Sequence, residues 1–212
     1  AAHDGSRTEP AARYSAPDAH GVRAVISGMS PGYLDEDASK RVVEAAGVPA
    51  PGRVVADSAD ELVRKAVALR APYVLKVLSS AIIHKSEVGG VVLGLSGDGA
   101  LARGYRTIAE NPKLAEIRPR RVLLEEMSPD GIDLMVGVRA DSQYGNVLLV
   151  GWGGVTAELF GMVVCRLLPV SRDEIDAMLD EVPGLSARLS GYRGVPAYDR
   201  AGVVDAVLRM CG

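Results

Sequence analysis

Aromatic residues and long apolar runs are scarce in this sequence. Only one Trp and one Phe occur among the 212 residues, so the base-stacking platforms of proteins that bind single-stranded nucleic acid are not expected. The formal net charge is −3, which argues against the basic surface that nucleic-acid binding needs. No apolar run approaches the roughly 18 residues of a membrane span. We therefore predict neither a nucleic-acid partner nor a membrane anchor.

Cysteine is also rare. The two cysteines, Cys165 and Cys211, lie far apart in the sequence and match no zinc-binding spacing. Cys165 falls in an apolar run, where a free thiol behaves as a small core residue. This usage fits a reducing compartment, and a cytoplasmic protein is the expectation.

The order of predicted elements indicates an α+β protein. Residues 1–30 are rich in Ala, Gly, Ser, Pro and charge and are predicted to be a tail or linker, with at most a short strand over 22–26. Residues 31–118 show the order helix, strand, helix, strand, strand, helix. Residues 119–212 form the second unit, which opens with a strand over 122–126. Because both units carry a glycine turn and charged residues, we expect a ligand cleft between them.

Local signals set the bounds of several elements. Capping boxes at Ser58–Glu61 and Ser171–Glu174 predict helix starts. Strands are expected over 132–138, 147–150 and 163–168, and the run 151–154 is predicted to be a glycine turn.

The segment 73–95 holds the strongest candidate for a ligand site. It opens with a predicted strand that Lys76 interrupts, and an ammonium group there is costly unless it has a partner. Gly89 and Gly90 follow, and glycine lets backbone N–H groups approach a ligand and form an anion-binding concavity. Together these residues suggest a polyphosphate site. The spacing alone is also consistent with a β-hairpin that carries a surface lysine.

Two further residues of this segment could act on a phosphate group. Lys85 could neutralise phosphate oxygens, as Lys76 could, or could simply be solvated. His84 is the one histidine outside the predicted tail, and a neutral imidazole is a competent nucleophile toward a phosphoryl group. Most lone histidines are structural, so the residue alone decides nothing.

Three carboxylates complete the candidates. Glu125 and Glu126 end a predicted strand at the expected hinge, where one could accept hydrogen bonds from an adenine amine or ribose hydroxyls, or both could be ordinary surface groups. Glu158 follows the glycine run in an otherwise apolar stretch. A carboxylate is a hard oxygen ligand suited to Mg²⁺ that carries nucleotide phosphates, so Glu158 is the candidate metal ligand.

A series of separated motifs resembles one family. The run 74–95, with its His-Lys-Ser triplet at 84–86, closely resembles the ATP-grasp domain of ADP-forming acyl-CoA synthetases, which in the two-subunit enzymes is the β subunit. The resemblance covers about residues 34–210. It continues in the same order through Glu125-Glu126-Met127, 136–138, Asp141, 151–155, Glu158, Arg166-Leu167 and 191–194.

The resemblance implies an ATP-grasp fold with nucleotide held between two α+β subdomains. It also implies the net reaction acyl-CoA + ADP + phosphate ⇌ acid + CoA + ATP, run through phosphohistidine, with His84 passing the phosphoryl group to ADP. No CoA-binding Rossmann domain is recognisable in 212 residues, so a CoA-binding partner is expected, in a hetero-oligomer or a fused chain. The residues expected to hold ATP or ADP are Lys76, Lys85, Gly89, Gly90, Glu125, Glu126, Met127 and Arg166, and those expected to bind Mg²⁺ are Glu158 and Asp141.

Two positions depart from the family pattern and keep other hypotheses open. Met162 stands four residues after Glu158, where family members commonly have aspartate, and a thioether is a poor Mg²⁺ ligand. Ala140 stands where an arginine is frequent. A nucleotide-sensing regulatory domain, similar to one in fused protein acetyltransferases, is therefore a second hypothesis. A third is an ATP-grasp ligase that couples a carboxylate to an amine, which the His-Lys-Ser triplet disfavours.

Overall fold

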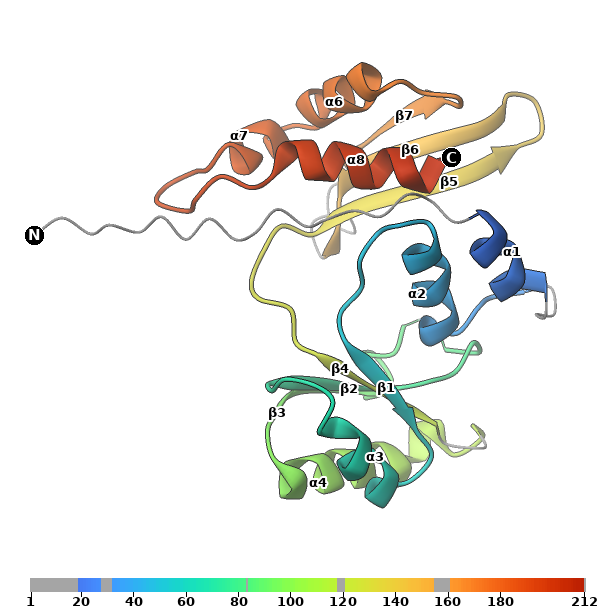
Figure 1. The fold of residues 1–212 in the computed structure, drawn as a ribbon, viewed down its shortest axis with the longest axis vertical. Helices are drawn as coiled ribbons and strands as arrows, with labels where there is room; N and C mark the ends of the chain where they lie inside the picture. The colour runs from blue at the N-terminus through green and yellow to red at the C-terminus, as the bar shows by residue number, and fades with distance from the viewer. Residues whose placement is uncertain (1–18, 28–31, 83, 118–120, 155–160, 212) are drawn as a thin grey trace, which may run out of the picture. The chain divides into compact units, whose positions relative to one another are not determined.

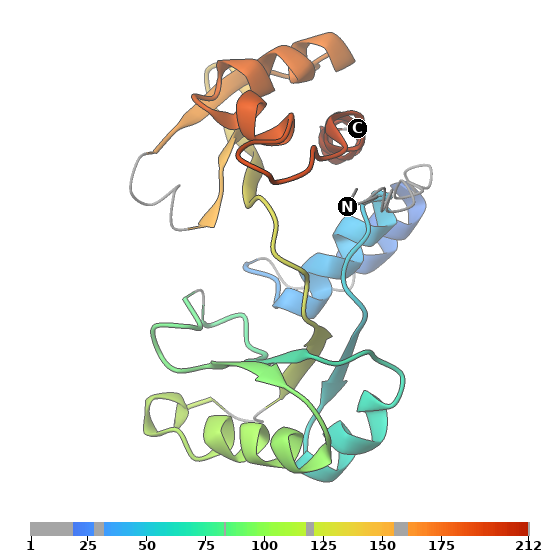
Figure 2. The same ribbon diagram turned by 90° about the vertical axis from the view of Figure 1, so that its left-hand side faces the viewer.

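The structure, a computed structural model, describes residues 19–27, 32–82, 84–117, 121–154 and 161–211. The chain divides into two compact units, each drawn in Figures 1 and 2. The first unit contains residues Ala19–Ala45 and Ala50–Pro129, and the second is built mainly on Asp130–Gly212. The predicted α+β class is confirmed, since both units combine helices with an antiparallel sheet.

The first unit is a four-stranded sheet with helices on both faces. Its strands pair antiparallel in the order β1-β4-β2-β3. Helices α3 and α4 lie side by side against one face (Figures 1 and 2). The elements are α1 (Ala19–Ser27), α2 (Glu36–Ala45), β1 (Arg53–Ala56), α3 (Ala59–Ala66), β2 (Tyr73–Val77), β3 (Val91–Leu95), α4 (Asp98–Ala109), the 3-10 turn η1 (Pro112–Leu114) and β4 (Val122–Glu126).

The two faces of this sheet differ because successive side chains of a strand point to opposite sides. Leu75 and Leu124 are paired across β2 and β4 and are fully buried in the core beneath α3 and α4. Val74 pairs with Glu125, and Lys76 lies two residues further along β2. Lys76 and Glu125 therefore share the opposite face, which is the face that α2 contacts.

Ion pairs attach α2 to this second face. Arg53 of β1 donates through Nε to Asp37 Oδ1 at 3.1 Å and through Nη2 to Glu44 Oε2 at 2.7 Å. Both carboxylates belong to α2, and the Arg53 side chain is only 9% exposed. These ion pairs act together with the buried apolar side chains of Val74 and Leu123, which lie on the same face as Lys76 and Glu125.

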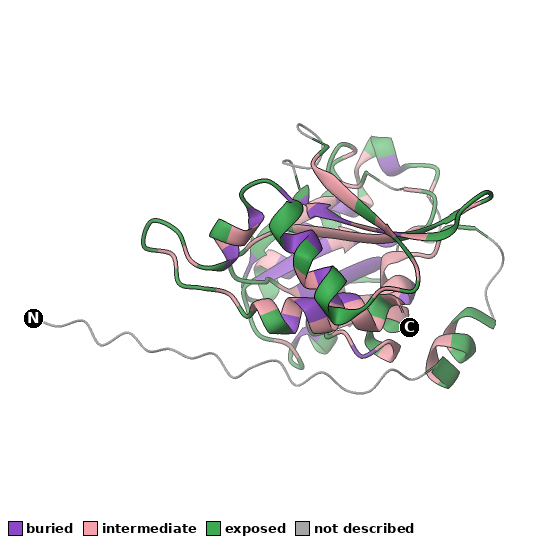
Figure 3. Cartoon of the chain, turned by 90° about the horizontal axis from the view of Figure 1, so that it is seen from above, coloured by how far each residue is buried: buried purple, intermediate pink, exposed green. Residues whose placement is uncertain are grey.

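In the described residues of the second unit, three helices pack on one face of a three-stranded sheet. Its strands are β5 (Leu134–Asp141), β6 (Gly145–Trp152) and β7 (Val163–Leu167), in that spatial order, and its helices are α6 (Arg172–Glu181), α7 (Leu185–Leu189) and α8 (Arg200–Cys211). Buried positions recur along the strands and the inner sides of the helices (purple in Figure 3). The core is formed by Leu148, Val150, Ile175, Met178, Leu179, Val182, Leu185, Leu189, Val204 and Val207.

Several details differ from the sequence prediction. Residues 122–126 were expected in the second unit but form β4, between β1 and β2 of the first sheet, because Val122 and Leu124 are buried in the first core. Residues 22–26 are helical within α1, which contacts α2. The predicted glycine turn at 151–154 is wrong in its first half, since β6 extends to Trp152. A Cβ at Gly151 would lie 2.3 Å from the Met162 carbonyl oxygen, so glycine allows a close backbone approach there.

The capping box at the start of α6 is present as predicted. The Ser171 hydroxyl accepts the Glu174 N–H, and the Glu174 carboxylate accepts the Ser171 N–H at 2.7 Å. Ser171→Ala is expected to lower the free energy of unfolding by about 1 kcal/mol, because it leaves a helix N–H without its partner. Urea unfolding measures this, with Ser142→Ala in the exposed β5–β6 turn as control. Equal midpoints for the two variants would contradict the prediction.

Candidate functional site

Five charged side chains of the first unit meet on the sheet face that α2 contacts. Lys76 Nζ lies 2.5 Å from Glu36 Oε1 and 2.7 Å from Glu125 Oε2. Lys40 lies one helical turn after Glu36 and contacts the same two carboxylates, with 3.0 Å to Glu36 Oε1. Lys85, in the segment between β2 and β3, lies 3.1 Å from Glu36 Oε2. We call these residues the lysine–glutamate cluster.

The cluster is rich in positive charge and poor in solvent. Three ammonium groups face two carboxylates, and Glu125 is only 2% exposed. Burial opposes ionisation of Glu36, but hydrogen bonds and charges from Lys76 and Lys40 outweigh it and lower the pKa of Glu36 to about 2. Burial likewise works against the charged form of Lys76, yet Glu125 and Glu36 raise the pKa of that ammonium group above its usual value. Glu36 and Lys76 are therefore expected to be charged at neutral pH.

The lowered pKa of Glu36 predicts acid sensitivity. Its pKa is about 2 in the folded chain against 4.5 for a free side chain, so the unfolded chain takes up the proton first as the pH falls. The stabilisation is complete above about pH 4.5 and is lost progressively toward pH 2. The shift itself corresponds to about 3 kcal/mol, and because the carboxylate is partly exposed, solvent screening reduces this to about 2 kcal/mol. Urea unfolding between pH 6 and pH 3 should show a shallower pH dependence for Glu36→Gln than for the wild type. Identical slopes would contradict the assignment.

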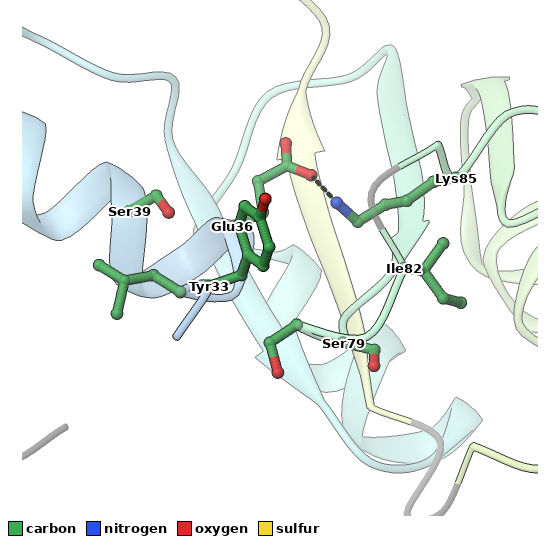
Figure 4. A pocket seen from close by; sticks show the side chains of 8 residues that line it. Tyr33, Glu36, Ser39, Ser79, Ile82 and Lys85 are labelled. Atoms are coloured by element: carbon green, nitrogen blue, oxygen red, sulfur yellow. Dashed lines mark ion pairs between the residues drawn. The ribbon is translucent and has the colours of Figure 1, made fainter. Parts of the chain in front are cut away.

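A small cavity adjoins the cluster within the first unit. It has a volume of about 250 Å³. Figure 4 shows the ion pair between the Glu36 carboxylate and the Lys85 ammonium group, both of which line the cavity. Three serines and a tyrosine contribute hydroxyl groups to the remaining wall, beside two aliphatic side chains. The lining residues are Tyr33, Leu34, Glu36, Ser39, Ser79, Ser80, Ile82 and Lys85.

His84 immediately precedes Lys85 in the segment that lines the cavity. Its side chain is 68% exposed, and its Nδ1 lies 3.8 Å from Glu87 Oε1. The imidazole is therefore accessible to a reactant and is not part of a core. Sequence places it next to a lysine of the cluster, which is what a phosphoryl relay at this residue would need.

The predicted glycine pair shapes the same segment. The Gly90 N–H donates to the Lys85 carbonyl at 2.7 Å, and the Gly89 N–H donates to the Ser86 carbonyl at 3.1 Å. A Cβ at Gly90 would lie 2.6 Å from Val77 Cγ1, so only glycine fits without a shift. Both N–H groups therefore donate to backbone carbonyls of the same loop, and these hydrogen bonds close the loop that carries Lys85.

Glu126 and Met127 lie at the end of β4. The Glu126 carboxylate accepts the Arg70 N–H at 2.9 Å, and the Met127 N–H donates to the Pro72 carbonyl at 2.9 Å. The Met127 side chain is 43% exposed. Glu125, by contrast, is committed to the lysine–glutamate cluster.

The candidate residues of the second unit are engaged locally. Asp141 Oδ1 accepts the N–H groups of Gln143 and Tyr144 in the β5–β6 turn, and these hydrogen bonds lower the pKa of Asp141. Arg166 forms an ion pair with Glu181 of α6 and donates to the Cys165 carbonyl. These contacts are all made within the second unit.

Metal binding has no ready-made site in the part of the chain that the structure describes. No three of its His, Cys, Asp or Glu side chains are grouped so that they could hold a metal ion. Glu158 lies outside the described residues, and Asp141 already caps a turn. The described donors alone do not fit a resident Mg²⁺ ion.

Sequence reasoning missed Glu36 and Lys40. They form an i, i+4 pair at the start of α2, and such a pair usually signals only a solvated helix surface. Nothing local distinguishes it from the neighbouring Asp37–Arg41 pair. Only the register of β2 and β4 shows that Glu36 and Lys40 face two charged strand residues.

Comparison with known proteins adds the family context. A family model of the ATP-grasp domain matches residues 28–211. The ADP-forming 4-hydroxybutyrate–CoA ligase of Nitrosopumilus maritimus is 32% identical over 184 residues, which are 85% of this chain and 26% of that protein. The β subunit of the ADP-forming acetate–CoA ligase II of Pyrococcus furiosus is 29% identical over 176 residues, which are 81% of this chain and 73% of that subunit.

Solved structures agree in fold. The dinucleotide forming acetyl-coenzyme A synthetase 1 of Ca. Korarchaeum cryptofilum, in complex with coenzyme A and Mg-AMPPCP and with its phosphohistidine segment pointing towards the nucleotide binding site, matches with a TM-score of 0.75 and 30% identity. The match covers 90% of this chain and 84% of that chain.

No helix in the described residues is long and apolar enough to cross a membrane.

The matched portion is one part of larger proteins. The chain spans about a quarter of the length of the first curated relatives it matches, whereas it spans most of the separate β subunits. The predicted resemblance is thus confirmed at the level of the family and the fold. The chain belongs to the ATP-grasp domain family, in the group found in ADP-forming CoA ligases.

Proposed function

We propose that this chain is the nucleotide-binding part of an ADP-forming acyl-CoA synthetase. In this proposal it binds ATP or ADP and relays a phosphoryl group between phosphohistidine and the nucleotide. The net reaction is acyl-CoA + ADP + phosphate ⇌ acid + CoA + ATP, and a CoA-binding subunit or domain supplies the remaining steps. Phosphoryl transfer depends mainly on positioning and on stabilisation of charge, which lysines and a metal ion provide.

One observation carries the proposal. Two lysines from different elements, Lys76 and Lys85, converge on a single carboxylate beside a cavity, and the exposed His84 precedes Lys85 in sequence. An anionic ligand that entered there would meet two cations next to a nucleophile. The relatives are named as ADP-forming ligases, which supports the same chemistry.

His84 would act as the phosphoryl carrier. In the direction of ATP synthesis, the N–P bond of phosphohistidine breaks and a P–O bond to the terminal phosphate of ADP forms, which leaves a neutral imidazole. Lys76 and Lys85 would neutralise the phosphate oxygens. Mg²⁺ would arrive as the counter-ion of the nucleotide, with Glu158 and Asp141 as proposed contacts, and it would supply further charge neutralisation.

Calorimetric titration tests the nucleotide site. We expect ATP and ADP to bind with one molecule per chain, and Mg²⁺ to alter the affinity. Inorganic phosphate at the same concentration serves as control for a non-specific anion effect. Absence of binding of both nucleotides, with and without Mg²⁺, would overturn the proposal.

A second function has one observation in its favour. Met162 stands where a metal-ligating aspartate is common in the family, and a thioether binds Mg²⁺ poorly. A nucleotide-sensing domain of a fused acyltransferase would bind nucleotide but would not form phosphohistidine. Radiolabelled ATP separates the two functions, because only the relay leaves an acid-labile label on the chain.

A further inference from the structure

Glu36 places a negative charge between the two lysines that would hold a phosphate group. We propose that Glu36 is an internal anion that competes with ligand phosphates for Lys76 and Lys85 and thereby sets the affinity of the site for polyphosphates. This inference rests on the proposed function for the identity of the ligand. It assigns a role to a residue that the sequence did not single out.

The geometry is that of a bridging oxyanion. Glu36 Oε1 lies 2.5 Å from Lys76 Nζ, and its Oε2 lies 3.1 Å from Lys85 Nζ. Two oxygens of one acid group thus bind two cations from different elements, as two oxygens of a phosphate would. The carboxylate also lines the cavity (Figure 4), so a ligand can reach it.

The cluster can release Glu36 without collapsing. Lys76 keeps a second carboxylate, Glu125, at 2.7 Å, and Glu36 keeps Lys40 at 3.0 Å on its own helix. Within the described residues Lys85 has Glu36 as its one ion-pair partner. When Glu36 is displaced, Lys85 therefore needs the incoming phosphate as its new partner. Exchange of one oxyanion for another therefore conserves the ion pairs of the buried residues.

The number of charges on the ligand decides this competition. A carboxylate carries a single negative charge, whereas a polyphosphate carries several within the same span. Electrostatic attraction grows with that charge, so a polyphosphate can displace Glu36 where a monoanion cannot. Because an anion must displace the Glu36 carboxylate to bind, Glu36 favours polyphosphates over small anions that carry one charge.

A charge-neutral variant tests the inference. Glu36→Gln keeps the length and the acceptor oxygen of the side chain but removes the competing charge. We expect it to bind ATP and inorganic tripolyphosphate roughly tenfold more tightly than the wild type, a change of about 1.4 kcal/mol. Glu61→Gln, which removes a carboxylate paired with Lys65 on α3, at the other face of the sheet, should leave both affinities unchanged. Unchanged or weaker binding by Glu36→Gln would overturn the inference, because Glu36 would then only position the lysines.

Tripolyphosphate separates this inference from the proposed function, since it needs no adenine site. Tighter binding of tripolyphosphate by Glu36→Gln supports the inference even if ATP does not bind, and failure of ATP alone overturns the nucleotide proposal. Carboxyl ¹³C NMR of the wild-type chain provides a test that does not depend on the folding of a variant. The Glu36 resonance should shift on addition of tripolyphosphate, and a resonance that stays unchanged at saturation would contradict displacement.

Discussion

Asparagine in place of His84 is expected to abolish phosphoryl transfer from ATP to the chain. The variant removes the nucleophilic nitrogen that would form the N–P bond while the β–γ P–O bond of ATP breaks. Loss of a nucleophile typically lowers turnover by about a thousandfold or more. His84 is 68% exposed, so its replacement should leave the fold intact, and the affinity for ATP should stay within about twofold because Lys76 and Lys85 supply the charge. The measurement is the acid-labile label left by ATP carrying a radioactive γ-phosphate.

A matched histidine makes this test specific. His20 lies in α1 and is also exposed, so His20→Asn should retain the full label. A label that persists in His84→Asn would show that another residue carries the phosphoryl group and would contradict the proposed relay. With a CoA-binding partner present, the same variant should lose net turnover to the same degree.

Much of the site could be predicted from the sequence because it lies in one continuous segment. Lys76 interrupts an otherwise apolar strand, and burial of an ammonium group requires a partner. The structure supplies two, Glu36 and Glu125. The hairpin from β2 to β3 also follows directly from the apolar runs on either side of the glycine pair.

The remainder depends on long-range register, which no local pattern contains. The strand 122–126 follows a proline-containing link, which favours a place in the second unit, yet it lies in the middle of the first sheet. That position sets Glu125 diagonally next to Lys76, with which it forms a buried ion pair. Glu36 is remote in sequence from both and is brought to them by the ion pairs that attach α2 to the sheet.

The two carboxylates of the cluster explain how a lysine-rich site can exist on a folded sheet. Like charges in close proximity repel, and two carboxylates hold the three ammonium groups together before any ligand arrives. The same carboxylates reduce the attraction for an anion. Stability of the first unit and affinity for phosphate are therefore expected to trade against each other at Glu36.

Lys76→Met should produce the second large effect, on both binding and stability. Removal of this ammonium group takes one ion pair from Glu36 and one from Glu125, which is 2% exposed. Loss of one partner of a buried pair leaves a desolvated charge, but Lys40 still contacts Glu125, so we expect the free energy of unfolding to fall by about 2 kcal/mol. The affinity for ATP should fall about a hundredfold, because a phosphate contact is lost and the two remaining lysines are balanced by two carboxylates, which leaves no excess positive charge.

The two effects can be separated by a second substitution. In Lys76→Met combined with Glu36→Gln, three cations and two anions become two cations and one anion, so the excess positive charge is restored without Lys76. Stability should recover in part, whereas ATP affinity should stay well below that of Glu36→Gln alone if Lys76 contacts the phosphates directly. Lys65→Met, which removes an exposed lysine paired with Glu61 on α3, controls for general charge loss. Full recovery of ATP affinity in the double variant would mean that Lys76 acts only through the charge balance of the cluster.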